Sequence, residues 1–201
     1  MIVIGLTGGI ASGKTTVARL LGERGARVID ADRLGHRAYE PGCNAHAAVA
    51  AAFGDDVIAA DGTIDRKALG GKVFGKPDQL KRLTAIVWPE IRRLAGNEIS
   101  EIARQDPNAI IVLEAAVLLE AGWESLVDEI WVTIVDRKTA IARAVERGGL
   151  DEEAAGARID SQLSNDERQA RAQVVLENAG DLSALDARVE EAWLGLRERT
   201  S

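Results

Sequence analysis

Metal-binding and redox-active side chains are scarce in this sequence of 201 residues. It holds one cysteine, Cys43, and two histidines, His36 and His46. A lone thiol cannot form an internal disulfide, and with two histidines it cannot complete the four-ligand set of a structural zinc site. We therefore expect no disulfide, no zinc cluster and no catalytic role for these three side chains, and we expect the chain to reside in the cytoplasm.

Long apolar runs and low-complexity segments are also missing. No stretch approaches the roughly 18 to 20 apolar residues that a membrane span needs. The apolar start at residues 1–6 has no basic segment before it and is too short for a signal peptide. Only 4 prolines occur, and no Ser/Pro or Gln/Asn tract is present. We predict one folded unit without a membrane segment.

Basic residues are outnumbered by acidic ones. The 25 Lys and Arg face 32 Asp and Glu, which gives a formal net charge of -7. This balance argues against a general nucleic-acid surface, so any phosphate group must be bound at a local site. We expect a small-molecule substrate, no nucleic acid, and a monomer or weak oligomer.

Five short runs rich in Val and Ile are present, separated by segments with the apolar spacing of helices. Most of the runs lack the alternation of a half-exposed strand, which is typical of buried parallel strands with helices on both faces of the sheet. The runs lie at residues 2–6, 27–29, 109–113, 129–135 and 173–176. The sequence thus predicts an α/β fold with a five-stranded parallel sheet.

Two segments are unlike simple crossovers. The longer is mostly helical, with helical patterns at 45–53, 77–87 and 88–104 and a turn at Asp61 and Gly62. The shorter is dense in charge and poor in large apolar residues, which favours a mobile lid. We predict a core at 1–33, 107–146 and 172–201, an insertion at 34–106 and a lid at 147–171.

The segment Gly8-Gly9-Ile10-Ala11-Ser12-Gly13-Lys14-Thr15 matches the P-loop pattern at every fixed position, and Thr16 follows it. Its glycines let the backbone N–H groups point inward around the phosphates of a nucleoside triphosphate, and the helix that follows adds its positive end. Lys14 is expected to bridge the β- and γ-phosphates, and Thr15 to bind Mg²⁺. A Gly-rich turn with a surface lysine is the alternative, which the full match in context disfavours.

Asp30 and Asp32 close the second strand, where ligands of an open α/β sheet bind. Asp32 is the candidate to accept the proton of an acceptor hydroxyl, with Asp30 as an orienting partner. The alternative is that Asp32 caps the helix that begins near Arg33. The residues alone leave both open.

Glu114 ends the third strand, a layout expected of an acid that holds Mg²⁺ beside a P-loop. Arg143 and Arg147 share a helix face because they are four residues apart. They lead into the predicted lid, whose arginines could neutralise the transferring phosphoryl group. A solvated helix with surface ion pairs is the alternative for any single arginine, such as Arg158, Arg168 or Arg171.

In their order and spacing, these segments resemble the dephospho-coenzyme A kinases over nearly the whole chain. The resemblance is carried by the P-loop, by residues 28–32, 40–42, 53–54, 61–66, 143–147 and 178–180, and by Leu69 and Gln162. Residues 88–91 and 114–123 look most like the kinase domain of the bifunctional eukaryotic coenzyme A synthase. Three positions depart from the family pattern: Ala11 replaces a common Gly, Trp88 replaces a common His, and Gly148 replaces a common acid. We expect the change at Ala11 to be conservative.

The resemblance implies a three-layer P-loop kinase core, a helical coenzyme A-binding insertion and a lid. It also implies transfer of the γ-phosphate of ATP to dephospho-CoA. Asp32 matches the family's base for the ribose 3′-hydroxyl, and Asn178 lies in the loop beside the adenine. The predicted substrate-binding residues are Asp32, Arg66, Leu69, Trp88 and Glu114, although Trp88 could equally be a core residue.

Two rival functions remain at this stage. One is another small-molecule kinase, for a nucleoside, nucleotide or sugar acid, with the same core and a different acceptor site. The other is a nucleotide-dependent switch. The switch is disfavoured because the sequence has no Asn-Lys-x-Asp motif for reading guanine and no transporter-type ATPase signature.

Overall fold

The five predicted strands form one sheet in a computed structural model that describes residues 1–200. Their order is β2-β3-β1-β4-β5. The pairings of β1 with β3 and β4, and of β4 with β5, are parallel. The strands are β1 (Ile2–Gly8), β2 (Arg27–Asp30), β3 (Ile110–Glu114), β4 (Glu129–Ile134) and β5 (Val174–Glu177). The predicted fold class is confirmed.

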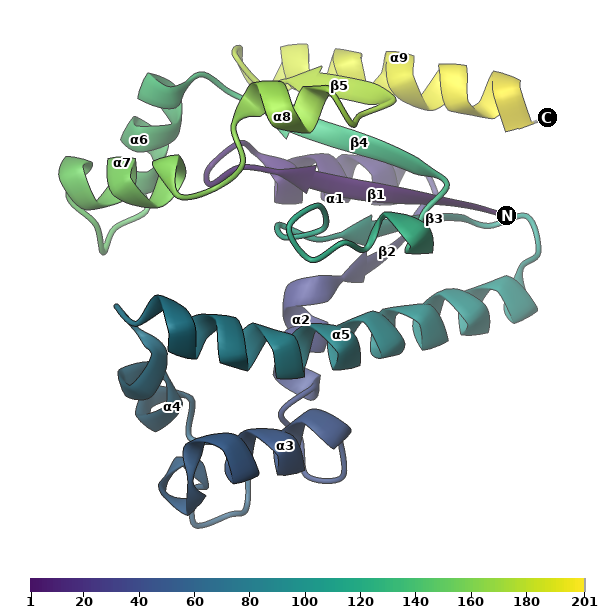
Figure 1. The fold of residues 1–201 in the computed structure, drawn as a ribbon. Helices are drawn as coiled ribbons and strands as arrows, with labels where there is room; N and C mark the ends of the chain where they lie inside the picture. Colours follow the sequence, from purple (N-terminus) through teal and green to yellow (C-terminus); the bar gives the residue numbers. More distant parts are fainter. Residues whose placement is uncertain (201) are drawn as a thin grey trace. The chain divides into compact units, whose positions relative to one another are not determined.

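The helices divide between two compact units, which are described separately. The first unit is Met1–Ile29 together with the chain from Glu101 onward, and the second is Asp30–Ser100. Figure 1 labels the helices α1 (Lys14–Glu23), α2 (Ala31–Arg37), α3 (Asn44–Phe53), α4 (Arg66–Val73), α5 (Pro77–Gln105), α6 (Arg137–Glu146), α7 (Glu152–Asp160), α8 (Asn165–Gln169) and α9 (Leu182–Thr200). Two short 3₁₀ helices cover Asp55–Val57 and Glu124–Leu126. Among residues 1–200, no helix has the length and apolar content needed to span a bilayer.

The main core of the first unit lies between the sheet and the helices α1 and α9. Ile4 and Leu6 on β1 pack there with Val17 and Leu21 on α1, all four fully buried. Alternate residues of β1 point to this side, as the pleat of a strand requires. Trp193 on α9 and Trp131 on β4 belong to the same cluster, and Trp123 is buried elsewhere in the unit.

The second unit is helical, as predicted for the insertion, but its longest helix is continuous. The helical patterns predicted at 77–87 and 88–104 join in α5, a 29-residue helix with Pro89 inside it. Proline lacks the N–H that an interior helical residue donates, so it would normally weaken the helix at this turn. Leu83, Val87, Ile91 and Leu94 are buried on both sides of Pro89, and this burial stabilises the helix through the proline.

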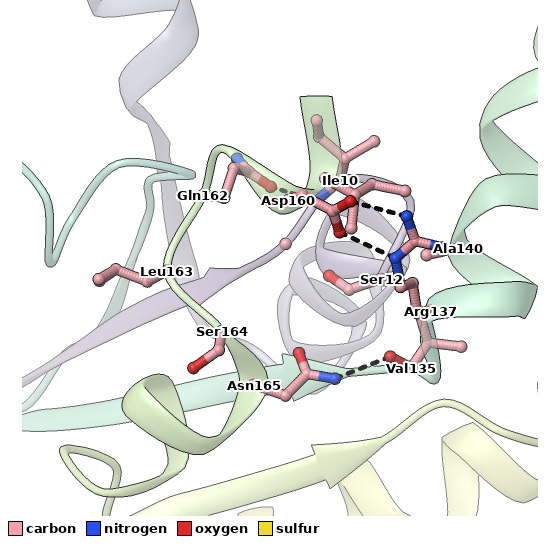
Figure 2. Close-up of a pocket in the computed structure, with 12 residues that line it drawn as sticks. Ile10, Ser12, Val135, Arg137, Ala140, Asp160, Gln162, Leu163, Ser164 and Asn165 are labelled. Carbon is pink, nitrogen blue, oxygen red and sulfur yellow. Dashed lines mark hydrogen bonds and ion pairs between the residues drawn. The ribbon is translucent and has the colours of Figure 1, made fainter. Parts of the chain in front are cut away.

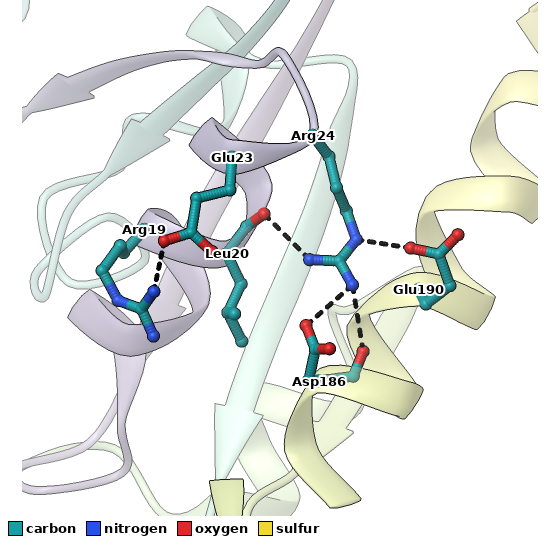
Figure 3. Close-up of polar contacts among 6 residues, drawn as sticks. All are labelled: Arg19, Leu20, Glu23, Arg24, Asp186 and Glu190. Carbon is teal, nitrogen blue, oxygen red and sulfur yellow. Dashed lines mark hydrogen bonds and ion pairs between the residues drawn. The ribbon is translucent and has the colours of Figure 1, made fainter. Parts of the chain in front are cut away.

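Arg24 fastens α1 to α9 within the first unit (Figure 3). Its guanidinium donates to Glu190 Oε2 at 2.6 Å, to Asp186 Oδ1 at 2.7 Å and to the Leu20 carbonyl oxygen at 3.0 Å. Burial by itself would lower the pKa of Arg24, but the hydrogen bonds to the two carboxylates outweigh it and the pKa is raised. The side chain is 16% exposed, so this cation is well placed to stabilise the helix pair.

We predict that Arg24→Ala lowers the free energy of unfolding by about 1.5 kcal/mol or more, because it removes charge-assisted hydrogen bonds from a mostly buried group. The control is Arg19→Ala on the same helix, whose exposed pair with Glu23 is worth less than about 0.5 kcal/mol. Urea denaturation of both variants and the parent measures the difference. Equal losses in the two variants would contradict the role given to Arg24.

Candidate functional site

The predicted P-loop connects the end of β1 at Gly8 to the start of α1 at Lys14. Two positions in it accept no larger residue. A Cβ on Gly8 would lie 2.4 Å from the Thr133 carbonyl oxygen. Gly13 has a φ of 95°, and a Cβ there would lie 2.1 Å from Asn178 Nδ2. Space therefore demands glycine at both positions, and the backbone conformation demands it at Gly13 as well.

Ala11 corrects one expectation from the sequence. It has a φ of 58°, the left-handed region that residues with a Cβ rarely adopt, so replacing the common Gly is not neutral for the backbone. Its methyl group is buried in a small cluster with Ala144 on α6 and Ala155 on α7. This packing offsets part of the conformational cost and joins the P-loop to the two helices.

Lys14, Thr15 and Glu114 lie together at the start of α1. Thr15 Oγ1 donates to Glu114 Oε1 at 2.7 Å, and Lys14 Nζ is 3.9 Å from the same oxygen. β3 places Glu114 here because it pairs with β1 and ends next to the P-loop, with Glu114 opposite Leu6. One cation, one hydroxyl and one carboxylate thus lie together beside the loop.

Arg147 reaches the same space from the end of α6. A small cleft of about 40 Å³ is lined by residues of the loop and by this one arginine: Gly9, Ala11, Ser12, Gly13, Lys14, Thr15, Thr16 and Arg147. Arg143, one turn earlier, points elsewhere and donates from Nη2 to the Asn178 carbonyl oxygen at 3.2 Å. The two arginines predicted to act together therefore contact different parts of the loop's surroundings.

Asn178 follows β5 and is 8% exposed. Its side-chain Nδ2 donates to the Ser12 carbonyl oxygen at 2.9 Å. The sequence predicts a nucleotide-binding position for this residue, and the structure places it against the P-loop.

A cavity of about 290 Å³ lies between the P-loop and the segment that follows α7 (Figure 2). Gln162 lines it and accepts a hydrogen bond from the Ile10 backbone N–H at 2.9 Å. Ser12 lines both this cavity and the small cleft beside Arg147, which we call the P-loop cleft. The buried Oγ of Ser12 has no hydrogen-bond partner within residues 1–200. Gln162 marks the family resemblance in the sequence, but its spacing gives no sign of this contact.

Arg137 and Asp160 form an ion pair at one side of the cavity and join α6 to the end of α7 (Figure 2). The two nitrogen–oxygen distances are 2.8 and 2.7 Å. The hydrogen bonds from Arg137 hold the pKa of Asp160 below its ordinary value, so the pair persists to lower pH than a free aspartate would allow.

Arg168 is neither a lid arginine that faces the phosphates nor a member of a solvated surface ion pair, the two roles that the sequence offers. It is fully buried, and its Nη2 donates to Glu120 Oε1 at 2.8 Å. A fully buried charge of this kind is retained only with a partner. Arg168 is therefore an internal anchor between α8 and the loop after β3. A hydrophilic segment pattern cannot reveal such burial.

Asp30, not Asp32, caps α2. The Asp30 carboxylate accepts hydrogen bonds from the backbone N–H groups of Asp32 and Arg33, at 2.9 and 3.3 Å. Asp32 lies in the first turn of α2 with an exposed side chain. The alternative in which Asp32 serves as the cap is wrong, and its carboxylate remains available for another role.

The other predicted substrate residues lie in the second unit. Arg66 is exposed at the start of α4, with Nη1 3.0 Å from His36 Nε2, a neighbour that the sequence does not suggest. Burial raises the pKa of the nearby Tyr39, and the positive charge of Arg66 opposes that shift. Trp88 is half-buried, whereas Leu69 is only 3% exposed and has little surface to offer a substrate.

Comparisons with known proteins agree over nearly the whole chain. The sequence profile of the family described as dephospho-CoA kinase matches residues 2–184. A dephospho-CoA kinase of Geobacter sulfurreducens is 47% identical over 193 residues, which cover 96% of this chain and 98% of that protein.

Two solved structures have the same fold. A crystal structure from Thermus thermophilus superposes with a TM-score of 0.79 at 37% identity and covers 96% of both chains. A dephospho-CoA kinase from Campylobacter jejuni superposes with a TM-score of 0.74 at 23% identity and covers 99% of this chain and 98% of its own.

Proposed function

The chain belongs to the dephospho-CoA kinase family, and from this premise we propose how its residues carry out the reaction. It is a phosphotransferase that converts dephospho-CoA to CoA, the final step of coenzyme A biosynthesis. Membership of a kinase family implies the use of ATP. The observation that ties this function to the site is the position of Lys14, Thr15 and Glu114 around the P-loop cleft.

The donor site is the P-loop from Gly8 to Thr16. Its inward amides and Lys14 hold the β- and γ-phosphates, and Arg147 adds positive charge from the end of α6. Ser12 Oγ offers a further donor, because it is buried beside the cleft with no partner in residues 1–200. These groups are fixed before the reaction, so they stabilise developing charge without reorganising.

Mg²⁺ fits the oxygen atoms present at this site. Thr15 Oγ1 and Glu114 Oε1 lie 2.7 Å apart, and both are the hard oxygen ligands that this ion prefers. Residues 1–200 contain no group of three or more His, Cys, Asp or Glu that could hold a metal, so phosphates and water would have to complete the coordination of this ion. We propose that Thr15 binds Mg²⁺ and that Glu114 binds the same ion either directly or through a water molecule. The ion, when bound, neutralises charge on the β- and γ-phosphates.

Asp32 is proposed as the base. The 3′-hydroxyl oxygen of dephospho-CoA forms the new bond to the γ-phosphorus while the bond to the bridging oxygen of ADP breaks. The hydroxyl proton passes to the Asp32 carboxylate. Two facts support this role: the carboxylate is exposed, and Asp30 rather than Asp32 provides the helix cap.

The insertion at 34–106 is proposed to hold the pantetheine arm of the acceptor, with Arg66, Leu69 and Trp88 as its candidate residues. The exposed guanidinium of Arg66 supports binding of an anionic group. Residues 147–171 are proposed as the lid and the remaining segments as the core. The compact unit Asp30–Ser100 supports the insertion boundary. A monomer or weak oligomer in the cytoplasm stays a prediction.

The acceptor is tested by ADP release. With ATP alone we expect slow release, because a kinase that excludes water closes only when both substrates are bound. Dephospho-CoA should stimulate release strongly, and AMP or adenosine much less, because they lack the arm whose binding energy positions the 3′-hydroxyl. If nucleosides, nucleotides or sugar acids are phosphorylated as well as dephospho-CoA, the proposed acceptor is wrong, although the donor site survives.

The base is tested by Asp32→Asn. We expect kcat for CoA formation to fall about 100-fold or more, because proton acceptance matters in the transition state. The dissociation constant for ATP should change little. Asp30→Ala is the control, since it removes the cap of α2 and should lower thermal stability more than Asp32→Asn does. Retained turnover in Asp32→Asn would exclude it as the base.

A further inference from the structure

Asn178 is held in place through both its backbone and its side chain. It follows β5 directly, and its backbone N–H donates to the Ile134 carbonyl oxygen at 2.8 Å, which extends the pairing of β5 with β4. Its side chain is buried, and its Nδ2 donates to the Ser12 carbonyl oxygen at 2.9 Å. The carboxamide is therefore held between the sheet and the P-loop.

The bond to Ser12 controls the direction of the next amide. A trans peptide is planar, so its C=O and N–H groups point in opposite directions. Because Asn178 holds the Ser12 carbonyl on one side of the loop, the Gly13 N–H is turned to the other side. Gly13 lines the P-loop cleft, so in the proposed nucleotide site this amide can donate to a phosphate oxygen.

Gly13 and Asn178 also fit each other sterically. The Gly13 φ of 95° brings its Cα so close to the carboxamide that a Cβ would lie 2.1 Å from Asn178 Nδ2. This position of the side chain therefore depends on glycine at residue 13. The carbonyl oxygen of Asn178 accepts in turn from Arg143 Nη2 at 3.2 Å, which connects the same residue to α6, the helix that precedes Arg147.

We propose that Asn178 is a positioning residue for the phosphates, acting through the Ser12–Gly13 peptide, and that it does not read the adenine base. This inference rests on the proposed nucleotide site. It predicts that Asn178 matters equally for any triphosphate, whether or not a nucleoside is attached.

The experiment compares MgATP with magnesium tripolyphosphate, which has the phosphate chain and no nucleoside, by titration calorimetry. Asn178→Ala should weaken both ligands by the same factor, about ten-fold, because a buried carbonyl loses its donor and the loop amide loses its fixed direction. The activity ratio between ATP and GTP should be unchanged. Asn178→Leu, which fills the volume without a donor, should behave in the same way and serves if the alanine variant does not fold.

Gln173→Ala is the matched control. Gln173 Oε1 accepts a hydrogen bond from the Ile130 N–H at 2.7 Å and so also links β4 to the β5 segment, but at the opposite end of β5 from Asn178, so this variant should keep both affinities. Loss of ATP affinity alone, or a changed ATP-to-GTP ratio, would make Asn178 a base-reading residue and overturn the proposal, as would unchanged affinities. A parent protein that binds neither ligand would instead overturn the proposed nucleotide site itself.

Discussion

The backbone conformation of the P-loop is the constraint on which the rest of the site depends. A loop of successive N–H groups binds phosphate only if its peptides are held in orientations that most residues resist. Here the cost is met at particular positions: Gly8 and Gly13 have no room for a side chain, and Ala11 adopts a left-handed conformation while its methyl group is buried. Contacts from Asn178 and Gln162 hold the loop in this conformation.

Local charge, and not overall charge, suits the site to an anion. The chain carries a formal net charge of -7, yet the cleft is bordered by Lys14 and Arg147. Glu114 lies 3.9 Å from Lys14 and also accepts from Thr15, so the cation has a partner when no nucleotide is bound. In our account, bound nucleotide and Mg²⁺ take over these contacts, and the charges become organised around the transferring phosphoryl group.

The sequence predicts well those features that lie in short segments. The strands follow from local runs of Val and Ile, and the P-loop follows from eight consecutive residues. Contacts between distant segments could not be predicted. Asn178 and Ser12 are 166 residues apart, and no pattern indicates that one would hold the other.

The burial of a charged side chain and the identity of a helix cap also could not be predicted from the sequence. Arg168 lies in a charged segment of the sequence but is fully buried against Glu120, and Asp30 caps α2, whereas the sequence offered Asp32 for that role. Pro89 lies inside a helix that the buried residues on both sides of it stabilise. In each case tertiary packing outweighs a local preference. The similarity of residues 88–91 and 114–123 to the kinase domain of the eukaryotic coenzyme A synthase stays a prediction.

The most direct test of whether the P-loop cleft is the catalytic centre is the activity of the Lys14→Ala variant. The measurement is the rate at which this variant forms CoA from ATP and dephospho-CoA. Lys14 serves the ligand and not the core, so the variant should unfold at the parent's temperature while kcat/KM falls by about 100- to 1,000-fold, roughly 2.7 to 4 kcal/mol. Lys138→Ala, an exposed lysine on α6, should keep the parent's activity. Equal turnover in Lys14→Ala and the parent would contradict the account.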